Sequence, residues 1–233
     1  MTPKEAIFKR KSIRKFESKS ISNEQMELIA RKVKELTPLY PNIEYNIDIT
    51  KKTKGMFNVK APHYLVFGSE EKEGHLENIG FIGQQMDLFL SSIGIGSCWL
   101  GGSKPVFDDE INLPYVICMA FGDSDEPLYR DATDFKRKSL VDISIGEDTR
   151  IEAARVAPSG INAQNWYFVA KDGLIHCYRK KPNLLSGVML NKMSYIDMGI
   201  AICHIAKVSD EFAFKKLDDV QIVKGCTYVG SVV

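Results

Sequence analysis

The chain has almost no net charge, because 31 lysines and arginines balance 30 aspartates and glutamates to leave a formal charge of +1. A protein that attracts nucleic acid or an anionic membrane non-specifically carries a clear positive excess. The composition therefore argues against both kinds of partner. Long apolar runs are also lacking, so we expect no membrane span and no signal peptide.

Cysteines are few and follow no pattern. There are five, an odd number, and none forms a Cys-x-x-Cys pair. Disulfide frameworks and structural zinc sites need paired or regularly spaced cysteines. We therefore expect reduced thiols and a cytoplasmic protein. The four histidines show no metal-ligand spacing either, so no metal site is predicted.

With 233 residues and a hydrophobic content of 44%, the chain can bury a sizeable core as one large domain or two intimate halves. Apolar periodicity predicts helices over residues 3–8, 23–36, 77–93, 149–156 and 194–208. Strands are predicted over residues 44–50, 64–67, 115–121, 166–171, 174–178 and 227–233. Ser22 and Gln25 form a capping-box pattern, Asp172-Gly173 a hairpin turn, and the lysine-rich segment 51–60 a solvated loop.

The order helix, strand, central helix, strand occurs twice along the chain. It begins again near Ile143. Such a recurrence indicates an internal duplication. We therefore predict two tandem half-repeats, residues 1–142 and residues 143–233.

Arg10-Lys11-Ser12-Ile13-Arg14 forms the first candidate binding motif. If this segment is extended, Arg10, Ser12 and Arg14 lie on one side of it. Guanidinium groups match phosphate oxygens bidentately, so the motif could seat a phosphate. The alternative is a solvated basic turn.

A second candidate segment follows the apolar helix 77–93. It reads Gly-Ile-Gly-Ser-Cys-Trp-Leu-Gly-Gly, from Gly94 to Gly102. A dinucleotide fingerprint is excluded, because the third glycine is absent and the run follows a helix instead of a strand. Glycines here would let the backbone approach a flat group. Further along, Lys136-Arg137-Lys138 is a possible anion contact, although such clusters are most often plain surface.

The third motif is Ala157-Pro158-Ser159-Gly160-Ile161-Asn162-Ala163-Gln164. Proline, serine and glycine favour a tight turn with exposed backbone, and the two side-chain amides can donate and accept hydrogen bonds. Such a turn suits a flat ligand with polar edges better than a metal or a nucleophile. An ordinary helix-to-strand loop is the alternative.

Together these three motifs resemble those of the nitroreductase family of FMN-dependent oxidoreductases. The resemblance implies an α+β fold, a nitroreductase-like α/β/α sandwich. The motifs are divided between the halves: the first half reads Leu39-Tyr40-Pro41-Asn42 where Ala-Pro-Ser would be expected, and the second lacks Arg-x-Ser-x-Arg. The chain therefore resembles a single-chain pseudo-dimer built from two half-repeats. It departs from the family at Asn165, where a proline is usual.

The resemblance also implies the residues that bind FMN. Arg10 and Ser12 would hold the phosphate and ribityl chain, with help from Lys136 and Lys138. Arg14 would approach the pyrimidine end of the flavin, where a cation favours reduction. Backbone at Leu100 and Gly101 would lie near the reactive N5. The flavin ring would be lined from the other repeat by Pro158, Ser159 and Gly160.

The reaction implied is a ping-pong hydride transfer from NAD(P)H, through the flavin, to a small acceptor such as a nitroaromatic or a quinone. The flavin would carry the chemistry, so no catalytic side chain is predicted. We expect a monomer whose two halves build one complete site. The alternative is a flavin-binding protein that stores or senses FMN without turnover.

Overall fold

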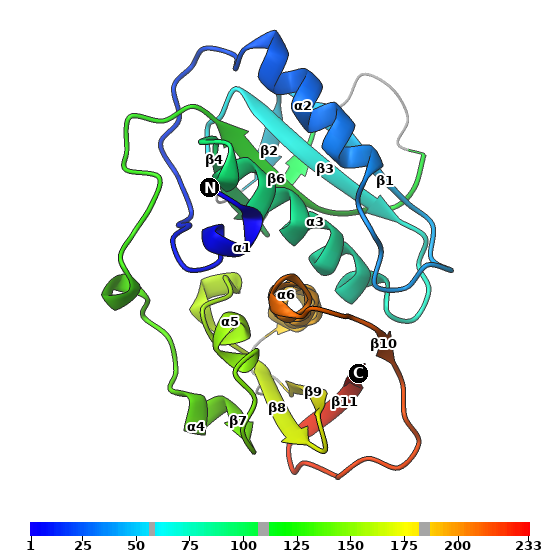
Figure 1. The fold of residues 1–233 in the computed structure, drawn as a ribbon. Helices are drawn as coiled ribbons and strands as arrows, with labels where there is room; N and C mark the ends of the chain where they lie inside the picture. The colour runs from blue at the N-terminus through cyan, green and yellow to red at the C-terminus, as the bar shows by residue number, and fades with distance from the viewer. Residues whose placement is uncertain (56–58, 107–111, 182–186) are drawn as a thin grey trace.

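A computed structural model of the protein describes residues 1–55, 59–106, 112–181 and 187–233. Two β-sheets lie on either side of a pair of crossed helices (Figure 1). The first sheet has the strand order β1-β3-β6-β4, and the second has the order β10-β11-β9-β8-β7. No helix in the described parts of the chain is long and apolar enough to cross a membrane.

The first half carries the following elements: α1 (Pro3–Ala6), α2 (Asn23–Lys34), β1 (Tyr45–Thr50), β2 (Thr53–Gly55), β3 (His63–Ser69), α3 (His75–Ser92), β4 (Gly96–Leu100), β5 (Ser103–Pro105) and β6 (Tyr115–Gly122). Its sheet is antiparallel throughout, with β3 in register against both β1 and β6. The predicted capping box forms at the start of α2: Gln25 N donates to Ser22 Oγ at 3.1 Å, and Ser22 N donates to Gln25 Oε1 at 2.9 Å.

The remaining elements along the chain are η1 (Ala132–Asp134), α4 (Leu140–Ile143), β7 (Ser144–Ile145), α5 (Ile151–Arg155), η2 (Gly160–Asn162), β8 (Trp166–Lys171), β9 (Leu174–Lys180), α6 (Gly187–Val208), β10 (Phe214–Lys215) and β11 (Cys226–Val232). The segment between β6 and α4 runs along one side of the molecule from the first sheet to the second (Figure 1). Asp172 and Gly173 have φ values of 53° and 77°, which the predicted hairpin turn requires.

The clearest differences from the predicted elements concern β4, the start of α6 and the segment 51–60. Gly96–Leu100 forms strand β4, although its glycine content gave no strand signal, because pairing with β6 holds it extended. Helix α6 begins at Gly187 instead of residue 194. Part of the lysine-rich segment 51–60 is strand β2, paired with β5, and its residues 56–58 lie outside the described residues.

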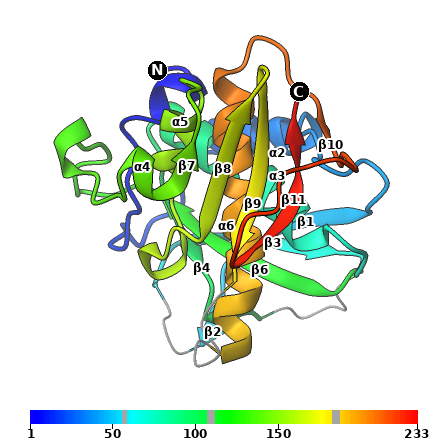
Figure 2. The ribbon, with the colours of Figure 1, turned by 90° about the horizontal axis from the view of Figure 1, so that it is seen from below.

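Helices α3 and α6 cross between the sheets, and their backbones touch at two glycines (Figure 2). A Cβ on Gly80 would overlap the carbonyl oxygen of Ile196, and a Cβ on Gly199 would overlap that of Glu77. The separation along the chain from Gly80 to Gly199 equals that from Glu77 to Ile196. The crossing is therefore symmetric, which is consistent with the predicted duplication.

We expect Gly199→Ala to lower the free energy of unfolding by about 3 kcal/mol, because the new methyl group must push the two helix backbones apart. In an unconstrained helix the same change would stabilise the protein. Urea unfolding followed by circular dichroism measures the effect. The exposed Val188→Ala on the same helix is the control and should change stability by less than about 0.5 kcal/mol. A Gly199→Ala variant as stable as the wild type would contradict this account of the crossing.

Candidate functional site

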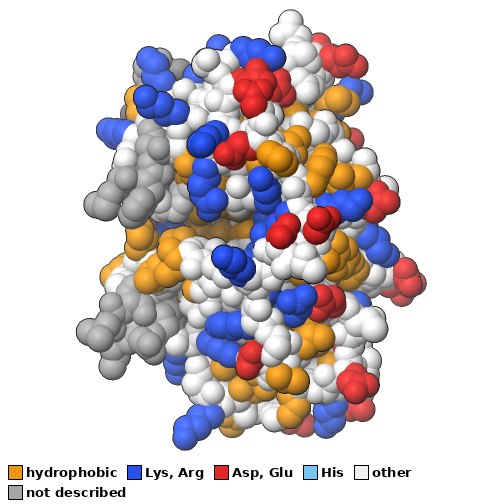
Figure 3. All heavy atoms as spheres, turned by 90° about the vertical axis from the view of Figure 1, so that its left-hand side faces the viewer, with side chains coloured by type: hydrophobic (Ala, Val, Ile, Leu, Met, Phe, Trp, Pro, Cys, Tyr) orange, Lys and Arg blue, Asp and Glu red, His pale blue; other side chains and the backbone are white. Residues whose placement is uncertain are grey.

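Two adjoining pockets open where the halves of the molecule meet. The inner pocket has a volume of about 130 Å³ and is lined by both half-repeats, including Trp99, Gly101, Gly160, Met193 and Asp197. The outer pocket has a volume of about 790 Å³ and includes Arg10, Arg130 and Arg137. Both pockets share the residues Ser12, Arg14, Pro158, Ser159 and Ile161. The face shown in Figure 3 is hollowed where the halves meet, and lysine and arginine side chains gather around the hollow.

The turn that carries Pro158, Ser159 and Gly160 is held by its own polar groups. Gln164 N donates to Ser159 Oγ at 3.0 Å, and Gln164 Nε2 donates to the carbonyl of Asn162 at 3.0 Å. Ile161, Asn162 and Gln164 all have positive φ, which is unfavourable for a β-branched residue such as Ile161. Gln164 therefore holds the turn from within and is buried instead of presented to a ligand, while the side-chain amide of Asn162 bonds to Lys136 and Arg137.

Two glycines, one from each half, face each other across the inner pocket. A Cβ added to Gly101 would lie 2.8 Å from Met193 Cε, and one added to Gly160 would lie closer still. The flexible end of Met193 therefore lies between the two glycine backbones. Leu100, in contrast, is buried on the far face of the first sheet with Tyr64, Val66 and Cys118 and does not line either pocket.

Arg10 is fixed at the base of the outer pocket by a buried acid. Its Nε lies 2.9 Å from Asp87 Oδ2, in an ion pair that is not a well-aligned hydrogen bond, and its Nη2 donates to Ser12 Oγ at 3.1 Å. Asp87 also accepts a hydrogen bond from Ser97 Oγ at 2.5 Å. Arg10 and Asp87 are both almost fully buried, so each charge depends on the other.

A chain of hydrogen bonds continues from Asp87 into the second half. Gln84 Nε2 donates to Asp87 Oδ2 at 2.9 Å and lies 3.0 Å from His204 Nε2, while Gln84 Oε1 accepts from Trp99 Nε1 at 3.1 Å. His204 Nδ1 lies 2.8 Å from the carbonyl of Ala153, so it must carry the proton. Burial lowers the pKa of His204 to about 3, and the imidazole is therefore neutral.

Arg130 and Arg137 add two further guanidinium groups to the outer pocket. Arg130 Nε donates to the carbonyl of Arg10 at 3.1 Å, and Arg137 Nε donates to that of Ala157 at 3.0 Å. Burial, followed by neighbouring positive charges, lowers the pKa of each to about 10. No carboxylate in the described ranges forms an ion pair with either of them. Arginines thus dominate the lining of the outer pocket, which also includes Glu126 and Asp134.

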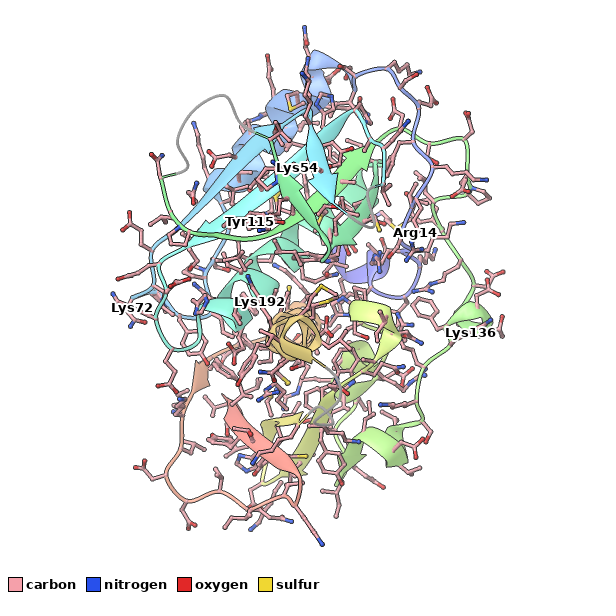
Figure 4. All side chains as sticks on the ribbon, turned by 180° about the vertical axis from the view of Figure 1, so that it is seen from behind. Arg14, Lys54, Lys72, Tyr115, Lys136 and Lys192 are labelled. Atoms are coloured by element: carbon pink, nitrogen blue, oxygen red, sulfur yellow. The ribbon has the colours of Figure 1, made fainter. Side chains whose placement is uncertain are left out.

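The resemblance to the nitroreductase family implied phosphate contacts from Lys136 and Lys138, the two neighbours of Arg137 in the sequence. Lys136 is exposed at the outer edge of the segment that joins the sheets (Figure 4), and it does not line either pocket. Lys138 Nζ donates to the carbonyls of Ala163 and Gln164, at 2.9 and 3.3 Å, behind the turn. The structure thus brings together Arg10, Ser12, Arg14, Gly101 and the turn of Pro158, Ser159 and Gly160. It does not bring Leu100, Lys136 and Lys138 to the pockets.

Asp197 is a residue of the inner pocket that the sequence analysis missed. It is fully buried on α6, and its Oδ1 accepts a hydrogen bond from Gly160 N at 2.9 Å. Burial raises its pKa to about 7. The sequence feature that could have identified Asp197 is its position as the single acid in the apolar run Ile196-Asp197-Met198-Gly199-Ile200. Within the described residues, no group of three or more His, Cys, Asp or Glu side chains could hold a metal ion.

Two sheets around a crossed helix pair, with a cationic pocket where the halves meet, define an α+β protein of the nitroreductase fold. The chain belongs to the family described as "Putative TM nitroreductase", whose model matches residues 3–209. The predicted family, fold and oxidoreductase class are thereby confirmed.

Solved structures support the fold. A putative nitroreductase from Thermotoga maritima aligns with a TM-score of 0.69 at 20% identity, covering 100% of this chain and 93% of that chain. A nitroreductase family protein from Clostridium difficile 630 aligns with a TM-score of 0.50 at 15% identity, covering 64% of this chain and 99% of that chain. The search of curated proteins found no match.

We expect Asp197→Asn to stabilise the protein at pH 8 and to change its stability little at pH 4. The folded-state pKa of Asp197 lies above its ordinary value, so the wild type loses stability as pH rises from about 4 to about 7 and the buried carboxyl ionises. Asparagine keeps the acceptor for Gly160 N without the charge. Melting temperatures of both proteins across this pH range measure the effect. A difference between the two proteins that stays constant with pH would contradict the assignment.

Proposed function

We propose that the protein is an FMN-dependent oxidoreductase that transfers hydride from NAD(P)H to a small acceptor such as a nitroaromatic or a quinone. The observation that carries the proposal is the continuity of the two pockets. An arginine-lined space for an anion leads directly into a narrow slot between two glycine backbones. A mononucleotide with one phosphate and one flat ring system has this shape.

The outer pocket fits the phosphate and ribityl chain. Arg10 and Ser12 lie at its base, and Arg130 and Arg137 provide the side chains that Lys136 and Lys138 were expected to provide. The neighbouring positive charges that help to lower the pKa of Arg130 and Arg137 would be offset by a shared dianion. Asp87 holds Arg10 in place, so the charge at the base of the pocket is positioned before a ligand arrives.

The inner pocket fits the ring system. A side chain at Gly101 or Gly160 would close the slot, and only the flexible thioether of Met193 occupies it. Pro158 and Ser159 line the slot from the second half. Arg14 stands at the junction of the two pockets and makes no ion pair or hydrogen bond with the described residues, so its charge is available to the pyrimidine edge.

Bound FMN supplies the hydride-accepting chemistry, and the protein supplies binding, orientation and electrostatics. The turn and α6 cover one side of the slot and shield it from water. Arg14 favours negative charge at the pyrimidine edge. No side chain needs to act as a nucleophile, and one chain provides one such site from its two halves.

Purified protein incubated with FMN should show the absorption of an oxidised flavin, and it should oxidise NADH or NADPH when menadione or a nitroaromatic is present. Steady-state assays at 340 nm measure the turnover. FMN uptake without turnover would instead favour the storage or sensing alternative. Protein that takes up no FMN would overturn both.

A matched pair of cations tests the phosphate site. Arg130→Gln should raise the Kd for FMN about tenfold to a hundredfold, because a charge-assisted hydrogen bond is worth about 1.5–3 kcal/mol. Lys136→Gln should leave the Kd within about twofold, since its charge is exposed outside the pocket and screened by solvent. Quenching of flavin fluorescence measures both. Equal losses in the two variants would count against the assigned pocket.

A further inference from the structure

A third pocket, the far pocket, has a volume of about 480 Å³ and includes Tyr40, Gly74, Glu77, Arg179 and Tyr195. Lys72 also lines it, and Figure 4 shows Lys72 and Arg14 at opposite edges of the molecule. The far pocket is therefore separate from the flavin site proposed above.

The far pocket is the symmetric counterpart of the inner pocket. Asn78 on α3 accepts hydrogen bonds from the backbone of Leu39 and Tyr40, at 2.8 and 2.9 Å, as Asp197 on α6 does from Gly160. Glu77 on α3 corresponds to Ile196 on α6. At the helix crossing, the carbonyl of Glu77 contacts Gly199, and the carbonyl of Ile196 contacts Gly80. Leu39 and Tyr40 thus make the backbone contact that Gly160 makes in the inner pocket.

Tyr40 in this position changes what the pocket can hold. The ring of Tyr40 lies against the start of α3, where a Cβ on Gly74 would be 2.8 Å from Tyr40 Cε2. The space that Gly160 leaves open in the inner pocket is therefore filled by an aromatic ring in the far pocket. The far pocket therefore lacks the glycine-lined slot that is proposed for the flavin ring.

Arg179 is a buried cation without a counter-ion. It is 5% exposed, and its Nη1 and Nη2 donate to neutral acceptors: Ser194 Oγ at 3.0 Å, Asn191 Oδ1 at 3.2 Å and Tyr195 Oη at 2.9 Å. Its Nε has no hydrogen-bond partner, and no carboxylate in the described part of the chain forms an ion pair with it. A buried guanidinium in this state is costly until an anion joins it.

The far pocket is also lined by Glu71, Glu73 and Glu77, and none of these carboxylates forms an ion pair with Arg179, although the charge of Arg179 acts to lower the pKa of Glu77. Lys72 is paired with Glu70, and Lys216 with Glu73. Glu77 is 6% exposed, and burial raises its pKa to about 7, so its carboxyl is partly protonated at neutral pH. The N-terminus of α3, which has no side-chain cap at Gly74, adds positive potential.

We propose that the far pocket binds a small aromatic carboxylate, with its carboxylate beside Arg179 and the start of α3 and its ring among Tyr40, Tyr195 and Tyr228. The charge on Arg179 selects an anion, and the three tyrosine rings select a flat apolar body. The proposal does not depend on the proposed function.

Benzoate is the probe, titrated by calorimetry into the purified protein both with and without saturating FMN. Saturable binding of one benzoate per chain is expected in both cases, and benzyl alcohol, which lacks the charge, should bind at least about tenfold more weakly. Arg179→Gln should weaken benzoate binding by a similar factor. Arg14→Gln, which removes an arginine from the other site, should not.

Several results would overturn the proposal: no saturable binding at millimolar benzoate, equal affinity for benzyl alcohol, undiminished binding by Arg179→Gln, or displacement of benzoate by FMN. If Arg179→Gln fails to fold, the comparison of benzoate with benzyl alcohol on the wild type still decides the charge requirement. Failure to bind FMN leaves the benzoate titration unaffected, so the two proposals fail separately.

Discussion

The close crossing of α3 and α6 is the constraint on which the rest of this structure depends. Two backbones in contact at Gly80 and Gly199 set the separation of the sheets and place a pocket at either end of the crossing. Each pocket borders a turn whose backbone is held by a polar side chain of the helix, Asp197 in one case and Asn78 in the other. A larger distance between the two helices would widen both pockets and break the hydrogen bonds that hold both turns.

The buried chain from Arg10 through Asp87 and Gln84 to His204 ties the anion pocket to that crossing. Each member uses its hydrogen-bonding capacity on the next: the neutral imidazole accepts from Gln84, the amide donates to Asp87, and the acid pairs with Arg10. Such a network contributes little net stability when the cost of desolvation is included. Its effect is positional, because a buried network of hydrogen bonds and an ion pair favours one arrangement of its members and thereby holds Arg10 in one place.

Local signals predicted most of the elements, whereas long-range contacts determine the parts that were missed. The capping box at Ser22 and the turn at Asp172 each depend on neighbours in sequence, so both could be predicted from the sequence. Strand β4 is extended only because β6 pairs with it, and a glycine-rich segment carries no sign of a partner. At the site, the motif residues Arg10, Ser12 and Gly160 meet as expected, but the residue of the 136–138 cluster that reaches the pocket depends on how the joining segment packs. Nothing in the sequence distinguishes Arg137 from the lysines on either side of it, and Arg130 belongs to no motif.

One turn of α6 borders two pockets at once. Met193 and Asp197 line the inner pocket, while Tyr195 lines the far pocket and Ser194 bonds to Arg179. A ligand that shifts this turn from either side changes the free energy of occupying the other side, and thermodynamic linkage makes the two effects equal in size. The sign depends on whether both occupants prefer the same position of the helix. Helix α6 thus provides a direct mechanical route between the inner pocket and the far pocket.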